Sequence, residues 1–304
     1  MAEEYWGIDL GGTKIEAVIL DSSLKPLIRH RIATESSSGY KHILERIRQL
    51  VEMISFQSGL VPPAQIGIGT PGRYDAEPGT INNSNTVCLN GRDLKRDLEE
   101  VLKRSVVIEN DANCFALAES MLGSASSIMR DPSKTAFGII LGTGVGGGIV
   151  SGGKVRHGAH GIAGEWGHNE LIPDGDLCYC DRRGCVETVI SGPALERYYQ
   201  QISGRCCSLE RIVAEAGTDR AASETLERLL FYFGKALAVV INILDPDVCI
   251  LGGGVGQVEQ LYSKIAVQAI EKFLFNSELR IPLLRPFLGD SAGVFGAALL
   301  TSAS

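Results

Sequence analysis

The chain has 304 residues, of which 44% are hydrophobic and 21% are charged, the balance of a globular protein large enough for two domains. Its net charge of −7 argues against a general affinity for nucleic acid or for an anionic membrane surface. No apolar run approaches the roughly 20 residues that cross a bilayer, and the acidic start leads directly into a predicted strand, so we expect no signal peptide and a cytoplasmic protein.

The first part of the chain predicts a mixed sheet covered by helices. Strands are expected at 5–10, 15–20, 27–33, 65–69 and 106–109, and helices at 40–56, 93–102 and 112–122. Gly11 and Gly12 are typical of a hairpin turn between the first two strands. Strands that first form hairpins and then alternate with helices indicate an α/β fold.

The second part begins in the same way. Strands are expected at 135–141, 148–151 and 248–251, and helices at 221–244 and 257–275. The repeated strand–turn–strand start predicts a duplicated fold with a cleft between the copies. The segment 120–132 is rich in serine and small residues, which makes it the best candidate for the boundary.

Three glycine-rich loops follow apolar strands. Glycine lets a backbone turn sharply and lets a ligand approach it closely, and main-chain N–H groups in such loops commonly bind phosphate. Ordinary turns would also explain any one of the loops, whereas three together favour a nucleotide. The loops are Asp9-Leu10-Gly11-Gly12-Thr13-Lys14, Gly142-Thr143-Gly144-Val145-Gly146-Gly147-Gly148 and Gly252-Gly253-Gly254.

Asp111 lies where a predicted strand ends and a helix begins. It is either the N-cap of that helix or a general base at the carboxyl end of a strand, where α/β sheets usually place ligands. Such a base would accept the proton of an attacking hydroxyl in phosphoryl transfer.

The eight cysteines do not form a disulfide framework, because only three of them are clustered. His168 with Cys178, Cys180 and Cys185 offers one imidazole and three thiolates, which suit a closed, structural zinc site. The alternative is a set of free core thiols near an unrelated histidine.

Glu187 follows the last of these cysteines by two residues, so the metal would fix its carboxylate beside a polar pocket of the kind that binds sugars. A nearby loop offers amides that either contact a sugar or simply form turns. Its asparagines are Asn82, Asn83, Asn85 and Asn90.

Taken together, these motifs resemble the ROK family of sugar kinases and repressors. The motifs that carry the resemblance are residues 9–14, Glu109-Asn110-Asp111-Ala112-Asn113, the loop from Gly142, Glu165-Trp166-Gly167-His168, the three cysteines, residues 251–254 and Gly289-Asp290-Ser291-Ala292-Gly293. The resemblance spans nearly the whole chain. It implies the two-domain actin-like, hexokinase-like ATPase fold, with duplicated ribonuclease H-like domains at 1–120 and 121–290 and a last helix at 291–304 that returns to the first domain.

The resemblance also implies roles for individual residues. Asp111 would be the catalytic base, and zinc would bind to His168, Cys178, Cys180 and Cys185. The sugar contacts would be Asn85, Asn110, Asp111, Glu165, His168 and Glu187, with His168 binding metal through one nitrogen and facing the sugar with its other edge. The ATP contacts would be Asp9, Gly11, Gly12, Thr13, Lys14, Gly142, Thr143, Gly144, Gly146, Gly147, Gly252, Gly253 and Gly254. Mg²⁺ would bridge the phosphates, through water held by Asp9.

Within the family, the stretches at 85–91, 163–169 and 242–247 look most like bacterial fructokinases of broad hexose range. Two positions depart from that pattern. Asp181 replaces a glycine after the second cysteine, and Leu288 replaces a histidine before Gly289.

We therefore expect an ATP-dependent kinase that phosphorylates the 6-hydroxyl of a hexose, with fructose as the first choice. Glucose, mannose and N-acetylglucosamine are the alternatives. A sugar-responsive repressor is disfavoured because the first strand begins by Tyr5, which leaves no room for a helix-turn-helix, and a sugar-binding protein without catalysis is disfavoured because the acidic residues and glycines are all present. The family also implies a dimer or tetramer.

Overall fold

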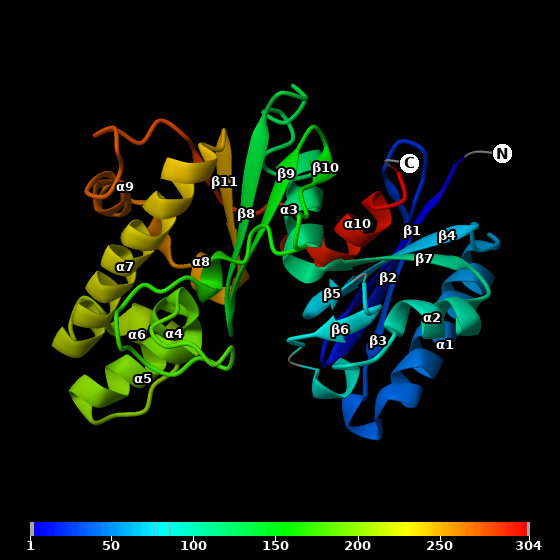
Figure 1. Ribbon diagram of the computed structural model, residues 1–304, viewed down its shortest axis with the longest axis horizontal. Helices are drawn as coiled ribbons and strands as arrows, with labels where there is room; N and C mark the ends of the chain where they lie inside the picture. Colours follow the sequence, from blue (N-terminus) through cyan, green and yellow to red (C-terminus); the bar gives the residue numbers. More distant parts are fainter. Residues whose placement is uncertain (1–2, 76, 85, 303–304) are drawn as a thin grey trace. The chain divides into compact units, whose positions relative to one another are not determined.

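The computed structural model describes residues 3–75, 77–84 and 86–302. The chain divides into two compact units, each with its own sheet and core (Figure 1). The first unit contains residues 1–126, 153–162 and 288–304, and the second contains residues 127–152 and 163–287.

The first unit holds the strands β1 (Tyr5–Leu10), β2 (Lys14–Leu20), β3 (Pro26–Ala33), β4 (Gln65–Thr70), β5 (Arg73–Asp75), β6 (Thr80–Asn82), β7 (Ser105–Asn110) and β10 (Lys154–Val155). Its helices are α1 (Tyr40–Ser58), α2 (Leu94–Leu102), α3 (Asp111–Met121) and α10 (Ala292–Leu299).

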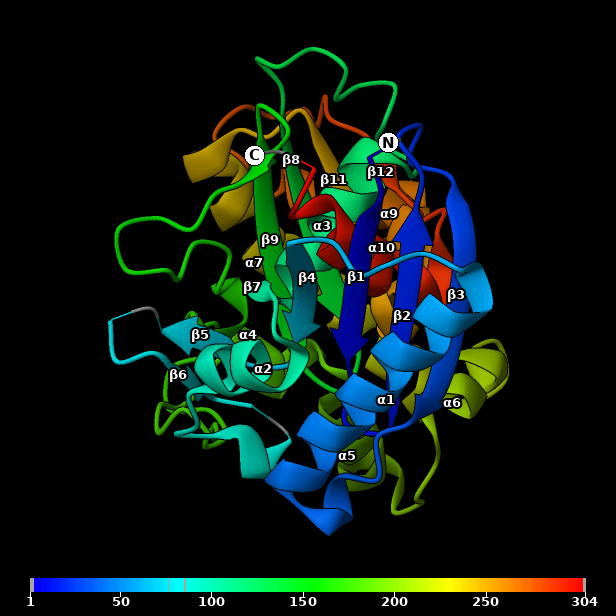
Figure 2. The same cartoon turned by 90° about the vertical axis from the view of Figure 1, so that its right-hand side faces the viewer.

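The main sheet of this unit has the order β3-β2-β1-β4-β7, with β5 and β6 forming a separate hairpin. β1, β2 and β3 are antiparallel neighbours, whereas β4 pairs in parallel with both β1 and β7. Figure 2 shows α1 in front of the sheet and α10 behind it. The larger core lies on the α1 side, where Trp6, Ile8 and Ile15 pack with Ile47 and Leu50.

α10 lies unusually close to the other face of the sheet. A Cβ added to Gly67 of β4 would lie 1.8 Å from the carbonyl oxygen of Ala297, and one added to Gly296 would lie 1.9 Å from the carbonyl oxygen of Cys114 in α3. Any side chain at these positions would collide with backbone, so the glycines allow α10 to pack directly on β4 and α3.

The second unit holds β8 (Thr135–Leu141), β9 (Val145–Ser151), β11 (Val248–Gly252) and β12 (Leu283–Leu284). Its helices are α4 (Val186–Ile190), α5 (Gly192–Ser203), α6 (Leu209–Glu215), α7 (Arg220–Leu244), α8 (Gly253–Gly256) and α9 (Lys264–Glu271). Within this unit the strands lie in the order β9-β8-β11-β12, and the core includes Phe137, Ile139, Phe233, Leu237 and Leu251.

The predicted duplication is confirmed by the sheet topology. In each unit an antiparallel hairpin, β1–β2 or β8–β9, precedes two strands that extend the sheet in parallel from the first strand of the hairpin. The expected α/β fold of the actin-like, hexokinase-like class is therefore confirmed.

Two predicted boundaries were wrong. The helix expected at 257–275 is broken into a single 3-10 turn, Glu259–Tyr262, and α9, because the Ser263 side chain accepts a hydrogen bond from the backbone N–H of Ala266 and starts a new helix. The Tyr262 hydroxyl also holds the turn by donating to the carbonyl of Gly256 at 2.8 Å.

The strand expected to start at residue 148 starts instead at Val145. Gly146 pairs with Ile140 and Gly147 pairs with Ile139, so both lie in the sheet. A Cβ on Gly147 would lie 2.7 Å from the carbonyl oxygen of Gly164, which explains a glycine inside a strand. The true loop is only Gly142–Gly144.

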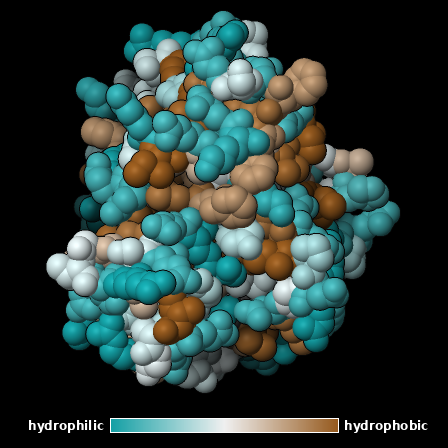
Figure 3. Space-filling view, turned by 90° about the vertical axis from the view of Figure 1, so that its left-hand side faces the viewer, coloured by the Kyte–Doolittle hydropathy of each residue, from teal (hydrophilic) through white to brown (hydrophobic). Residues whose placement is uncertain are grey.

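Among the described residues, no helix is both long and apolar enough to cross a membrane. Figure 3 shows one face of the molecule, where apolar residues form several groups separated by hydrophilic ones. The large exposed apolar side chains include Phe231, Ile243, Ile265 and Phe275.

Candidate active site

Asp111 begins helix α3 at the carboxyl end of β7, but it is not the N-cap. Asn110 takes that role, because its Oδ1 accepts a hydrogen bond from the backbone N–H of Asn113 at 2.8 Å. The exposed Asp111 side chain accepts from the N–H of Ala112 at 2.8 Å. The N-cap interpretation of Asp111 was therefore wrong, and the carboxylate lies at the positive end of the helix dipole.

Glu109, in the same strand, links the start of α3 to His157 through its hydrogen bonds. Its Oε1 accepts from the N–H of Asn110 and from Nδ2 of Asn113, both at 2.9 Å, and its Oε2 lies 2.5 Å from Nε2 of His157. The hydrogen bond to Glu109 raises the pKa of His157. We did not predict a role for His157, because nothing in a lone histidine 46 residues after Asp111 indicates that the chain folds back there.

The first glycine loop turns as predicted. Its hairpin is closed by a hydrogen bond from the N–H of Gly11 to the carbonyl of Lys14 at 2.9 Å. Thr13 is exposed at its tip, and Nζ of Lys14 lies 3.9 Å from a carboxylate oxygen of Asp290. A Cβ on Gly12 would come within 3.2 Å of Oγ1 of Thr86, so the loop has little room for side chains.

Asp9, the penultimate residue of β1, lies close to other acidic residues of this unit. Burial, helped by the charges of Asp111 and Glu16, raises the pKa of Asp9 to about 7, while Lys14 and Arg31 act in the opposite direction. The carboxylates of Asp9 and Asp111 are thus near enough to repel each other, which is the setting that a bound cation would relieve.

The second unit brings two of the predicted glycine loops together. Gly142–Gly144 follows β8 and Gly252–Gly254 follows β11, and a Cβ on Gly142 would lie 3.9 Å from the N atom of Gly254. A Cβ on Gly254 would meet nothing within 4 Å, so its backbone is open to a ligand. The loops therefore meet at the carboxyl ends of parallel neighbours, the usual position of ligands in α/β sheets. Thr143 is exposed between the glycines.

The four predicted metal ligands also meet in the second unit. The ligand atoms of His168, Cys178, Cys180 and Cys185 all lie within 4.8 Å of one another. Nδ1 of His168 lies 3.6 Å from Sγ of Cys178, and Sγ of Cys180 lies 3.6 Å from Sγ of Cys185. A tetrahedral Zn²⁺ with bonds of about 2.3 Å to sulfur separates its ligands by roughly 3.8 Å, so this donor set fits zinc.

Asp181 does not disturb this cluster. Its φ of 65° is left-handed, the conformation that glycine adopts most easily and that aspartate tolerates better than most residues. Its N–H bonds to the carbonyl of Cys178 at 3.0 Å and closes the turn between the cysteines. Leu288 is the other position that departs from the fructokinase pattern. Its backbone N–H donates a hydrogen bond to Oε1 of Glu119 at 2.8 Å.

Near the metal ligands, Tyr179 contacts the ring edge of His168 that the resemblance assigned to sugar. The Tyr179 hydroxyl lies 2.9 Å from Nε2 of His168. Burial and the charges of Glu187 and Glu165 raise the pKa of Tyr179, so these predicted sugar contacts lie around it. Sequence reasoning missed Tyr179, since it stands between two ligands with no pattern of its own.

The asparagine side chains of the loop at residues 82–90 mainly stabilise the loop itself. Asn90 accepts from the N–H of Ser84 at 2.8 Å and donates to the carbonyl of the same residue at 3.0 Å. Asn83 has a left-handed φ of 56°, which is typical of a turn. Asn85, the predicted sugar contact, lies outside the described residues.

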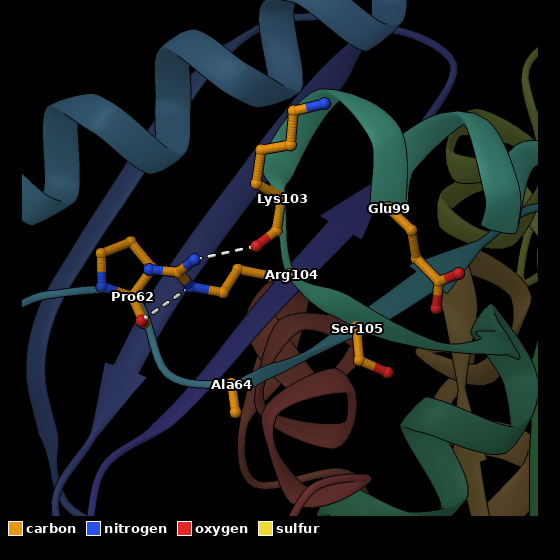
Figure 4. Close-up of a pocket in the computed structure, with 6 residues that line it drawn as sticks. All are labelled: Pro62, Ala64, Glu99, Lys103, Arg104 and Ser105. Atoms are coloured by element: carbon orange, nitrogen blue, oxygen red, sulfur yellow. Dashed lines mark hydrogen bonds between the residues drawn. The ribbon is translucent and has the colours of Figure 1, made fainter.

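A separate open hollow of about 780 Å³ lies in the first unit (Figure 4). Its lining includes Ala64 and Ser105, which stand at the amino ends of β4 and β7. Arg104 spans it by donating to the carbonyls of Pro62 and Lys103. Because Asp111 follows the opposite, carboxyl end of β7, this hollow is not the predicted catalytic site.

Comparison with known proteins decides the family. The model of the ROK family matches residues 5–304. The chain belongs to the ROK family. This assignment confirms the family that the sequence motifs predicted.

Curated members of the ROK family resemble the chain along nearly its whole length. An N-acetylgalactosamine kinase of Shewanella is 35% identical over 97% of this chain and 96% of the relative. An N-acetyl-D-glucosamine kinase of Vibrio parahaemolyticus is 34% identical over 97% of this chain and 99% of the relative. These relatives agree with the predicted sugar kinase, but they do not support the predicted fructokinase type.

Solved ROK structures superpose well. The ROK hexokinase of Thermus thermophilus has a TM-score of 0.86 and 34% identity, covering 98% of this chain and 97% of that one. A ROK glucokinase of Streptomyces griseus, solved with glucose and the ATP analogue AMPPNP, has a TM-score of 0.78 and 30% identity, covering 99% and 100%.

Proposed function

We propose that this ROK protein is an ATP-dependent sugar kinase that phosphorylates the 6-hydroxyl of an N-acetylhexosamine. The observation that carries the kinase proposal is the corner at β7 and α3. Asn110 caps the helix, and the exposed carboxylate of Asp111 lies at the carboxyl end of β7, where a base for the sugar hydroxyl is expected.

In the proposed reaction, Asp111 accepts the proton of the sugar hydroxyl as its oxygen attacks the γ-phosphorus of ATP. A new P–O bond forms to the sugar, the bond between the γ-phosphorus and the β,γ-bridging oxygen breaks, and ADP leaves with that electron pair. Because phosphoryl transfer needs mainly positioning and charge neutralisation, one well-placed carboxylate and a set of backbone N–H groups suffice for the protein's part.

The glycine loops are proposed to hold the nucleotide. Gly252–Gly254 and Gly142–Gly144 present open backbone on one edge of the second sheet. The loop from Asp9 to Lys14 is proposed as a further contact for the nucleotide. Mg²⁺ would neutralise the phosphates, with Asp9 as its protein partner. Zn²⁺ on His168 and the three cysteines would be structural, because the four donors leave no open position.

Sugar binding is proposed for Asn110, Asp111, Glu165 and Glu187. His168 is left out, because its Nε2 edge bonds to the Tyr179 hydroxyl. The amino-sugar preference rests on the curated relatives, which are N-acetylhexosamine kinases at 34–35% identity. A plain hexose is the second candidate, favoured by the Thermus hexokinase and the glucose complex of the Streptomyces enzyme. Assembly into dimers or tetramers stays a prediction.

The test is ADP release with a panel of sugars under identical conditions. We expect the highest kcat/KM with N-acetylglucosamine or N-acetylgalactosamine, above glucose, mannose and fructose. A higher value for glucose or fructose would replace the amino-sugar assignment with a hexokinase. No sugar-dependent ADP release with any of them, from folded and metal-loaded protein, would contradict the kinase proposal and favour a sugar-sensing regulator.

A further inference from the structure

Glu187 lies between the metal-ligand cluster and the second glycine loop. It is the second residue of α4 and follows the ligand Cys185 by two positions. Its Oε2 accepts a hydrogen bond from the backbone N–H of Val145 at 2.8 Å. A Cβ on Gly144 would lie only 2.5 Å from the same oxygen. The carboxylate therefore packs directly on the backbone of the loop.

The segment that carries the histidine ligand also packs against Val145, the first residue of β9, on its carbonyl side. Gly167, next to His168, lies so close that an added Cβ would be 2.0 Å from the carbonyl oxygen of Val145. Nε1 of Trp166 donates to the carbonyl of Gly146 at 3.0 Å. Val145 itself is buried, so its position is set by these neighbours and not by solvent.

The start of the loop is held by the chain just beyond α4. The N–H of Gly192, the first residue of α5, donates to the carbonyl of Gly142 at 2.8 Å. Glu187 and Gly192 thus support the two ends of a turn whose glycines leave it little stiffness of its own. The conformation of the loop depends on contacts from the segment behind it.

We propose that Glu187 is a positioning residue for nucleotide binding, in addition to its proposed contact with the sugar. The N–H of Gly142 closes the turn on the carbonyl of Gly144 at 2.9 Å. By accepting from Val145, Glu187 keeps the N–H groups of Thr143 and Gly144 in the arrangement that receives phosphate. The sugar part of this inference rests on the proposed function, in which the second oxygen, Oε1, contacts a sugar hydroxyl. One side chain would then serve both substrates.

This role differs from a pure sugar contact in a measurable way. A carboxylate that only binds sugar has no effect on nucleotide affinity when sugar is absent. A residue that holds the glycine loop affects the nucleotide affinity even when sugar is absent. Glutamine can still accept from Val145 through its amide oxygen but loses the charge, whereas alanine loses the acceptor altogether.

The experiment is calorimetric titration of the zinc-loaded protein with AMPPNP and Mg²⁺, without sugar. We expect Glu187→Ala to weaken nucleotide binding about tenfold, the size of one lost hydrogen bond to a charged group. Glu187→Gln should stay within about twofold of the wild type, while its KM for the sugar rises about tenfold. Glu165→Gln is the matched control, because it alters another proposed sugar contact and should leave this nucleotide affinity unchanged.

Unchanged nucleotide affinity in Glu187→Ala would overturn the proposal, and so would an equal loss in Glu187→Gln. If Glu187→Ala does not fold, Glu187→Asp carries the test, because its shorter side chain fails to reach Val145 and should also weaken AMPPNP binding. Hydrogen exchange at the Val145 amide should be faster in either variant while the Tm changes little. Since no sugar enters the titration, a wrong sugar assignment leaves these results interpretable.

Discussion

The glycine turns of the two units occupy equivalent positions in equivalent sheets but have different support. The turn after β1 is surrounded by ionisable side chains, with Asp9 on its strand and Glu16 paired opposite it. The turn after β8 has no such pair; it is held by Glu187 and by backbone contacts from the segments that carry the metal ligands. The duplicated topology thus places both turns, while the side chains and segments that contact each turn decide its chemistry.

This difference assigns separate tasks to the units. The first unit concentrates carboxylates at Asp9, Glu109 and Asp111. Burial chiefly, and then the charges of these three residues, raise the pKa of Cys114. The second unit offers glycine backbone and a metal cluster. If the comparison is correct, changes in the first unit should alter charge-dependent steps, and changes in the second should alter metal content and loop geometry.

The largest effect is expected at the carboxylate corner. Asp111→Asn should lower kcat by about 10²- to 10⁴-fold while the sugar still binds, because the amide cannot accept the proton of the attacking hydroxyl. Steady-state kinetics with sugar titration measure both quantities. The exposed Asp174→Asn is the control and should have nearly normal kcat. Near-normal turnover in Asp111→Asn would remove this residue from the role of base.

The corresponding test in the second unit concerns the metal. Cys185→Ser should reduce zinc from about one ion per chain to a small fraction and lower the Tm by about 5 °C or more, because the four ligands close the segment around α4. Elemental analysis and calorimetry measure these changes. Cys206→Ser alters an exposed cysteine outside the cluster and should change neither. Fully active wild-type protein without metal would contradict the zinc assignment.

A smaller effect, on the pH dependence of the free energy of unfolding, is expected when Asp9 is replaced. Its folded-state pKa of about 7 is above the usual value, so the folded state favours the protonated form and loses stability as the pH rises from about 4 to about 7. Asp9→Asn removes this loss. Urea unfolding without ligands should therefore show a small gain over the wild type at pH 4.5 and a gain of about 4 kcal/mol at pH 8, because one pKa unit corresponds to about 1.4 kcal/mol. A difference that does not vary with pH would contradict the burial of this charge, and the exposed Asp290→Asn should show none.

The smallest effect is expected for the tether between His157 and Glu109. The pKa of His157 is raised, so its stabilising contribution is complete below the unfolded value near 6.5 and is lost as the pH rises through the folded value. Because the ring is 61% exposed, solvent screening limits the effect of His157→Gln to about 0.5 kcal/mol at pH 6, and less at pH 9. Urea unfolding at both values measures it, with His160→Gln in the same loop as the control. An equal loss in the free energy of unfolding at both pH values would show that the charge of His157 does not contribute to stability.

Much of the fold follows from local patterns. The apolar spacing from Ile43 to Ile54 predicts α1, and the two strand–turn–strand starts predict the duplication, because neighbouring residues alone determine which face of a helix or strand is apolar. The cysteine spacing likewise indicates the metal site, since the ligands lie within 18 residues of one another in sequence. The start of β9 was misjudged because glycine favours a turn locally, while Gly147 is needed in a strand for packing against Gly164.

Residue types at short separations were enough to predict the class of fold, the family motifs and the candidate ligands. The folded chain was needed to show that Asn110, and not Asp111, caps α3. The same is true of the contacts of His157 with Glu109, of Tyr179 with His168 and of Glu187 with Val145. These contacts depend on the direction of individual side chains and on segments up to 48 residues apart. Such pairings arise from the packing of the whole unit, which no local pattern of apolar and polar residues records.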